Sequence, residues 1–154
     1  MGIVLDTGSA ESTLDDKGRV NIPVSFREHF HGELVITRGD KPSAMILTPQ
    51  VWERFKQSEE NSEVLTHEQR EAFKSKYLSQ VKVVELDNAG RIAIPPIIRK
   101  YAKLTRNCVV IRDKDRLLIW DSDEYDAYLE EIDPIAQAAM NILGSHDIFR
   151  AKQV

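Results

Sequence analysis

The chain has 154 residues with 42% hydrophobic and 30% charged side chains and a formal net charge of −4, which is ordinary for a soluble globular protein. No run of about 18 apolar residues is present, and the first residues lack the basic and apolar regions of a secretory signal, so we expect neither a membrane span nor secretion. The single cysteine, Cys108, excludes an internal disulfide, and its apolar surroundings predict a small buried residue in a reducing compartment.

The acidic residues are unevenly distributed. Residues 121–133 hold seven acidic and no basic side chains, which leaves the rest of the chain at +3. A local cationic surface that binds nucleic acid is therefore compatible with the negative total, although the charge alone does not argue for one.

The first third of the chain predicts short strands and helices. Alternating or β-branched patterns predict strands that end at Leu14 or span residues 19–22, 34–37 and 44–47. Gly18 can take the positive φ of a turn. Pro23 suits the first turn of a short helix, which carries Phe26 and Phe30 inward. Thr48 is a suitable N-cap for the next helix.

A connecting segment follows. The polar residues 58–62 predict a loop, and residues 66–78 predict a helix. Thr66 and Gln69 stand at the spacing of a capping box, which supports a helix start at this point.

The same order of elements then returns. The predicted strands end at Leu86 or span residues 91–94, 108–111 and 117–120. Gly90 occupies the turn, and Pro95 precedes a helix with Ile98 and Ala102 on its inner face.

The C-terminal part predicts two helices. The first is capped by Asp121 or Ser122 and contains the acidic run. A second begins after Pro134 and ends near Gly144, and the tail that follows has no clear pattern.

An internal repeat accounts for this order. LDDKGRVNIP at residues 14–23 matches LDNAGRIAIP at residues 86–95, and an arginine, Arg27 or Arg99, stands four residues after each final proline. The later strands and the closing helices correspond as well, with small insertions. The chain therefore contains a tandem duplication.

The Asp-x-x-x-Arg turn, its two copies and the helix between them resemble the MraZ family, within the AbrB-like DNA-binding proteins, over roughly residues 8–135. The resemblance implies a mainly β fold with peripheral helices, in which two AbrB-like repeats interleave as a double-split (swapped-hairpin) β-barrel with pseudo-twofold symmetry. It also implies a ring-shaped homo-oligomer that binds short repeated sites upstream of the division and cell-wall gene cluster and usually represses it. We expect a cytoplasmic, nucleoid-associated protein that takes no cofactor, metal or small-molecule substrate.

The corresponding segments are repeat 1 at 9–55, a linker and connecting helix at 56–80, repeat 2 at 81–128, and a C-terminal helix and tail at 129–154.

The repeated turn supplies the candidate DNA-binding residues. An arginine at a tight turn presents a planar, permanently charged group that suits phosphate or guanine. The candidates for contact with double-stranded DNA are Arg19, Arg91, Lys17, Arg27 and Arg99. The candidates for supporting the turns are Asp15, Asp87, Gly18 and Gly90. From the residues alone, the Asp–Arg pairs could equally be local ion pairs that only hold a hairpin.

Two other functions stay open. An AbrB-like antitoxin would bind a toxin through its C-terminal tail, although such antitoxins usually carry a single copy of the motif. An enzyme is not expected, because the sequence contains no catalytic or phosphate-binding motif. The run HEQRE at residues 67–71 lacks the second histidine of a zinc-binding helix.

Overall fold

The computed structural model describes residues 2–150, which divide into two units, 2–122 and 123–150. The first unit contains eight strands: β1 Thr7–Thr13, β2 Arg19–Asn21, β3 Leu34–Arg38, β4 Ala44–Leu47, β5 Lys82–Val84, β6 Arg91–Ala93, β7 Asn107–Asp113 and β8 Arg116–Asp121. Its helices are α1 Val24–Arg27, α2 Pro49–Glu60, α3 His67–Phe73, the π-helix η1 Lys74–Leu78 and α4 Pro96–Tyr101. Helix α5, Ser122–Gly144, makes up most of the second unit.

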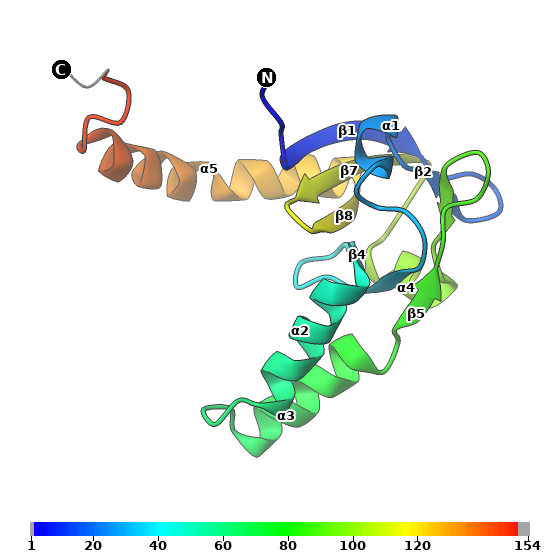
Figure 1. The fold of residues 1–154 in the computed structure, drawn as a ribbon. Helices are drawn as coiled ribbons and strands as arrows, with labels where there is room; N and C mark the ends of the chain where they lie inside the picture. Colours follow the sequence, from blue (N-terminus) through cyan, green and yellow to red (C-terminus); the bar gives the residue numbers. More distant parts are fainter. Residues whose placement is uncertain (1, 151–154) are drawn as a thin grey trace. The chain divides into compact units, whose positions relative to one another are not determined.

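The strands of the two repeats are exchanged (Figure 1). Six strands form a sheet in the order β1-β7-β8-β4-β3-β5, and β2 pairs with β6 in a separate antiparallel ribbon. The first strand of each repeat pairs with the third strand of the other, as β1 with β7 and β5 with β3. Neither repeat could complete this sheet alone. The mainly β fold built from two tandem repeats is confirmed.

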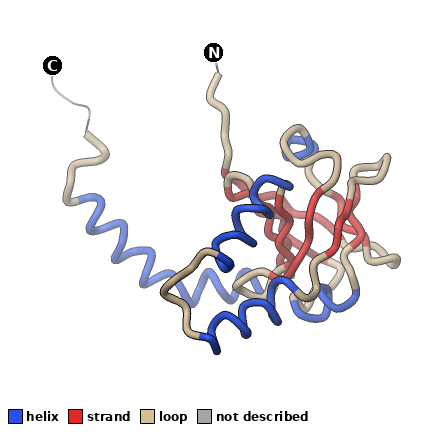
Figure 2. The backbone as a smooth tube through the Cα atoms, turned by 60° about the horizontal axis from the view of Figure 1, so that its bottom comes forward, coloured by secondary structure: helices blue, strands red, loops and turns tan. Residues whose placement is uncertain are grey.

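The ribbon connects the two edges of the six-stranded sheet. β1 continues through the first turn into β2, and β5 continues through the second turn into β6. Reciprocal hydrogen bonds of 2.9 Å, from Ile22 N–H to Gly90 O and from Ile94 N–H to Gly18 O, join the turns to the opposite strands. In Figure 2 the strands of the first unit gather in one body, with the helices of that unit around them.

The core lies between the ribbon and the sheet. Along each ribbon strand the apolar residues point inward, and Val20, Ile22, Ile92 and Ile94 are at most 2% exposed. Phe30 from the first repeat and Ile98 from the second close the same core, as predicted, although Phe30 lies beyond the end of α1 rather than on it. Burial of such side chains contributes about 1.5–3 kcal/mol each, so the core fixes the ribbon in place.

A helical hairpin projects from this body, with α2 and α3 side by side (Figure 1). The rings of Phe55 and Phe73 lie 5.2 Å apart between them. Thr66 and Gln69 form the predicted capping box at the start of α3.

Three local predictions were wrong. Residues 58–60 belong to α2 rather than to a loop, because Glu59 is only 3% exposed and pairs with Arg70 at 2.9 Å. Pro134 lies inside α5, which continues through it as one helix. Pro23 and its counterpart Pro95 stand just before their helices, with φ near −52° and −55° and an extended ψ, rather than in the first turn. Residues 151–154 of the predicted tail lie outside the described residues.

Candidate nucleic-acid interface

The two repeated turns have the same geometry. The Oδ1 atom of Asp15 accepts hydrogen bonds from the backbone N–H groups of Lys17 at 3.0 Å and Arg19 at 2.9 Å, and Oδ2 accepts from Nε of Arg19 at 2.7 Å. Gly18 has a φ of +78°, a conformation that a residue with a Cβ rarely adopts. The aspartate thus closes the turn and aligns the arginine.

In the second turn, Asp87 accepts hydrogen bonds from the N–H groups of Ala89 at 3.0 Å and Arg91 at 2.9 Å, and from Nε of Arg91 at 2.9 Å. Gly90 has a φ of +80°. Both halves of the duplication therefore build the same Asp–Arg unit from the same local contacts.

The β2–β6 ribbon brings the two units together. Nη1 of Arg19 lies 4.0 Å from Oδ2 of Asp87, and Nη1 of Arg91 lies 3.8 Å from Oδ2 of Asp15. We call these four residues the turn cluster. Their side chains are between 28% and 35% exposed, so the guanidinium groups are held firmly and still reach solvent.

Hydrogen bonds keep both aspartates ionised. The backbone N–H of Arg19 is the largest influence on Asp15 and lowers the pKa of that carboxyl from its usual 3.8, helped by the Arg19 side chain and opposed by desolvation. The backbone N–H of Arg91 lowers the pKa of Asp87 in the same way. The turn cluster is therefore neutral as a whole, because two carboxylates balance two guanidinium groups. Attraction to a polyanion has to come from cations around it.

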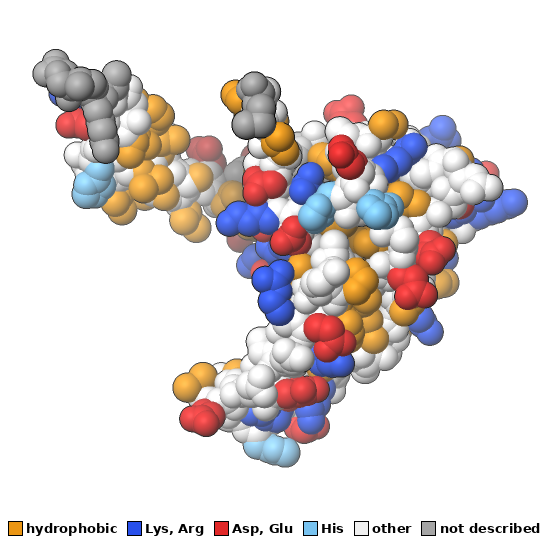
Figure 3. Space-filling model, viewed as in Figure 1, with side chains coloured by type: hydrophobic (Ala, Val, Ile, Leu, Met, Phe, Trp, Pro, Cys, Tyr) orange, Lys and Arg blue, Asp and Glu red, His pale blue; other side chains and the backbone are white. Residues whose placement is uncertain are grey.

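Exposed cations stand in the first turn and on or after the helix whose Arg99 packs over that turn. Lys17 is exposed at the tip of the first turn, and Lys100, Lys103 and Arg106 are exposed on and after α4. In Figure 3, blue Lys and Arg side chains project at the right edge of the molecule, where Figure 1 places the two turns. These cations stand beside exposed acidic side chains, among them Asp16 next to Lys17 and Glu85 before the second turn.

The remaining candidates, Arg27 and Arg99, are partly buried. Each lies over the turn glycine of the other repeat: a Cβ atom on Gly90 would be 2.1 Å from Cζ of Arg27, and one on Gly18 would be 2.2 Å from Nη1 of Arg99. Unlike Lys17, these two arginines pack against the turns.

A family model described as "MraZ protein, putative antitoxin-like" matches residues 6–75 and 78–143, one match for each half of the chain. The chain belongs to the MraZ family. Three relatives carry the name "Transcriptional regulator MraZ". They come from Parafrankia sp. (37% identity, 80% of this chain and 86% of the relative), Kineococcus radiotolerans (34%, 82% and 88%) and Frankia alni (37%, 80% and 85%).

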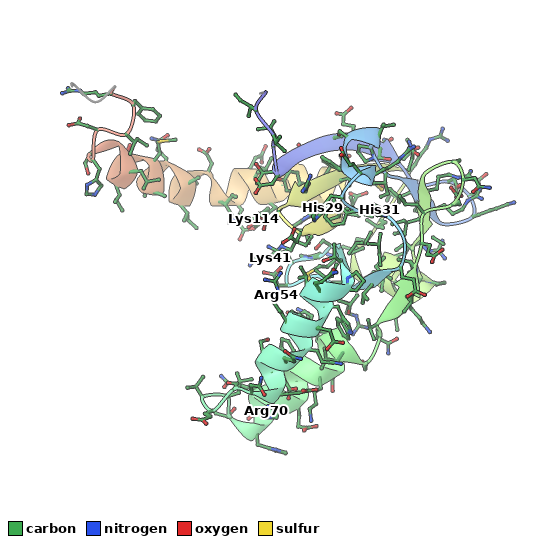
Figure 4. All side chains as sticks on the ribbon, viewed as in Figure 1. His29, His31, Lys41, Arg54, Arg70 and Lys114 are labelled. Atoms are coloured by element: carbon green, nitrogen blue, oxygen red, sulfur yellow. The ribbon has the colours of Figure 1, made fainter. Side chains whose placement is uncertain are left out.

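A second pair of equivalent positions in this MraZ chain was not identified from the sequence. His29 Nε2 lies 2.8 Å from Oδ1 of Asp115 in the β7–β8 hairpin, and Tyr101 donates a 2.6 Å hydrogen bond to the carbonyl oxygen of Gly39 after β3 (His29 is labelled in Figure 4). The shift that superimposes the two motifs also superimposes His29 on Tyr101. His29, just after α1, and Tyr101, the last residue of α4, thus each tie one repeat to a hairpin of the other. Because a histidine and a tyrosine share no motif, only their matching positions in the two repeats could have indicated this equivalence.

Among residues 2–150, no group of three or more His, Cys, Asp or Glu side chains could hold a metal ion. In the same part of the chain, no helix has both the length and the apolar character of a membrane span.

Proposed function

We propose that this chain is a sequence-specific DNA-binding transcriptional regulator that reads DNA with the turn cluster. The observation that supports this proposal most is the pairing of Arg19 and Arg91 on one ribbon, each oriented by an aspartate and about one-third exposed. A pre-oriented guanidinium group can bind a phosphate or a guanine edge with little loss of conformational freedom. Lys17 adds a flexible charge beside them.

The names of the three relatives support the same class of function. From membership of the MraZ family we further propose a cytoplasmic, nucleoid-associated repressor of its own promoter, upstream of the division and cell-wall gene cluster. We retain residues 9–55 and 81–128 as the two repeat units.

We also propose that the protein works as a ring-shaped homo-oligomer on repeated sites. Helix α5 carries exposed apolar side chains, among them Ile135, Ile142 and Leu143, which a second copy could cover. One subunit presents few cationic contacts, so a single engagement should be weak and sensitive to salt. Several linked engagements raise the apparent affinity by about 10²–10⁴.

The decisive experiment is a genome-wide DNA pull-down with the wild-type protein and the Arg19→Ala/Arg91→Ala double variant. The wild type is expected to enrich one promoter, and the double variant is expected to remain folded and lose that enrichment. Unchanged enrichment would exclude the turn cluster as the reader. Recovery of a small toxin with the protein, and of no promoter, would favour the antitoxin alternative.

The number of repeats is tested separately. In a gel-shift series at one salt concentration, a fragment with four repeats of the recovered site should bind far more tightly than a fragment with one. Equal affinities for the two fragments would exclude the proposal that simultaneous binding to several repeats strengthens the complex.

A further inference from the structure

The guanidinium group of Arg27 occupies a narrow position between the two repeats. Its Nε donates to the carbonyl oxygen of Ile22 at 2.7 Å, and Nη2 donates to Oδ1 of Asn21 at 3.1 Å. Its flat face lies against Gly90, where any Cβ would overlap it. The side chain is therefore held by its own repeat and touches the turn of the other.

Both sides of this contact are adjacent to Arg91. Gly90 precedes Arg91 in the chain, and Asn21 is its partner in the β2–β6 register. The Ile22 N–H also donates to the Gly90 carbonyl oxygen at 2.9 Å. Arg27 thus contacts both Gly90, which precedes Arg91 in the chain, and Asn21, which lies opposite Arg91 in the ribbon.

The second repeat has the same close approach of an arginine to a glycine, but among the described residues neither hydrogen bond of Arg27 has a counterpart. Arg99 lies over Gly18, which precedes Arg19. The counterpart of Asn21 on the other ribbon strand is Ala93, so Arg99 has no amide oxygen to receive its donors there. Arg27 is therefore held more firmly than Arg99.

We propose that Arg27 and Arg99 are positioning residues that act across the repeats, with Arg27 fixing Arg91 and Arg99 fixing Arg19. This rests on the proposed function, and it replaces direct DNA contact as the role of these two residues. A guanidinium group packed on the turn glycine fixes the position of the turn backbone. The arginine that follows the glycine, Arg91 or Arg19, is therefore held in one direction. Because Ala93, the counterpart of Asn21, offers no side-chain acceptor, the coupling of Arg27 to Arg91 is the stronger of the two.

Double-variant cycles in DNA binding test the pairing. Fluorescence anisotropy on the shortest duplex recovered with the wild type would compare Arg27→Ala alone, in an Arg91→Ala background and in an Arg19→Ala background. Alone or with Arg19→Ala, the change should weaken binding about tenfold, within the range measured for coupled neighbours. In the Arg91→Ala background, Arg27→Ala should weaken DNA binding by less than a further factor of about two, because the side chain that Arg27 positions is already absent.

Arg27→Lys is the matched control for charge. Lysine keeps the positive charge and loses the planar group that fits over Gly90, so it should weaken binding as much as alanine does. If Arg27 instead touches a phosphate, lysine should retain most of the affinity. Circular dichroism of both variants would establish that they are folded, and the lysine variant carries the test should the alanine variant unfold.

A readout in the free protein separates this inference from the proposed function. The Nε–H resonances of Arg19 and Arg91 report their bonds to Asp15 and Asp87, and Arg27→Lys should shift the Arg91 resonance and leave that of Arg19 in place. Equal losses of binding in the two backgrounds, or equal shifts of the two resonances, would overturn the positioning role. Failure of the wild type to bind any DNA would overturn the proposed function, while the resonances would still decide the positioning.

Discussion

Substitution of Gly90 by alanine tests how closely the two repeats fit. An L-residue in the left-handed region costs about 1–2 kcal/mol, partly offset by the lower entropy of the unfolded chain. The new Cβ would also displace the Arg27 guanidinium, which makes two hydrogen bonds. Each such bond contributes about 1 kcal/mol. We therefore expect Gly90→Ala to lower the free energy of unfolding by about 3 kcal/mol.

Gly32 offers a matched control, because it has a φ of +68° and no atom lies within 4 Å of an added Cβ. Gly32→Ala should cost only the backbone strain, about 1 kcal/mol. Gly18→Ala should fall between them, because Arg99 has to move but has no counterpart of the Asn21 amide to lose.

The assay is thermal unfolding followed by circular dichroism at one protein concentration, because self-association would shift the midpoint. At about 2–4 °C per kcal/mol for a chain of this size, Gly90→Ala should lower Tm by about 6–12 °C and Gly32→Ala by about 2–4 °C. Combining Gly90→Ala with Arg27→Ala should cost less than the sum of the two changes. Equal losses of Tm at Gly90 and Gly32 would show that the Arg27 contact is energetically unimportant, and the reasoning would fail.

Three further outcomes are expected. The lowered pKa of Asp15 contributes stability that is complete above the unfolded value of 3.8 and is lost as the pH falls through the lower folded value. In urea unfolding, the free-energy difference between wild type and Asp15→Asn should therefore be constant from pH 7 to 5 and shrink below about pH 4. A difference that stays constant down to pH 2 would contradict this. Burial raises the pKa of the Cys108 thiol to about 11, so iodoacetamide at pH 7 should label the folded protein far more slowly than the protein in urea, and equal rates would refute this shielding. Arg70→Met leaves the buried Glu59 carboxylate without its ion-pair partner and should lower the free energy of unfolding in urea by about 3 kcal/mol. Glu71→Gln removes only the exposed pair with Lys74 and should lower it by less than about 1 kcal/mol. Equal losses would show that burial is irrelevant.

Features decided by local chemistry could be predicted from the sequence. The turns follow from glycines that take a positive φ and from aspartates that accept nearby N–H groups, and these appear as a motif repeated in the chain. The ribbon strands follow from β-branched residues next to those turns. The exchange of strands between repeats does not follow from spacing, because nothing local fixes which distant strand β1 will meet; only the family resemblance implied it.

The residues of the candidate site could be proposed from the sequence, but their geometry could not. The sequence identifies Arg19 and Arg27 as positive charges near one turn, but cannot show that the first reaches solvent beside Asp87 while the second lies over Gly90. The end of α2 was missed for a similar reason, because the ion pair that holds Glu59 comes from a residue eleven positions away. Contacts of this range depend on the completed fold.

The exchange of strands has a consequence for how the molecule assembles. Two separate chains, each with one repeat, would have to meet in solution before either could complete the sheet, and their stability would fall on dilution. Joining them through α2 and α3 makes that encounter intramolecular, at an effective concentration in the millimolar range or above. The two halves then no longer have to be identical, and Asn21 opposite Ala93 and His29 opposite Tyr101 are places where they have diverged while the shared frame is kept.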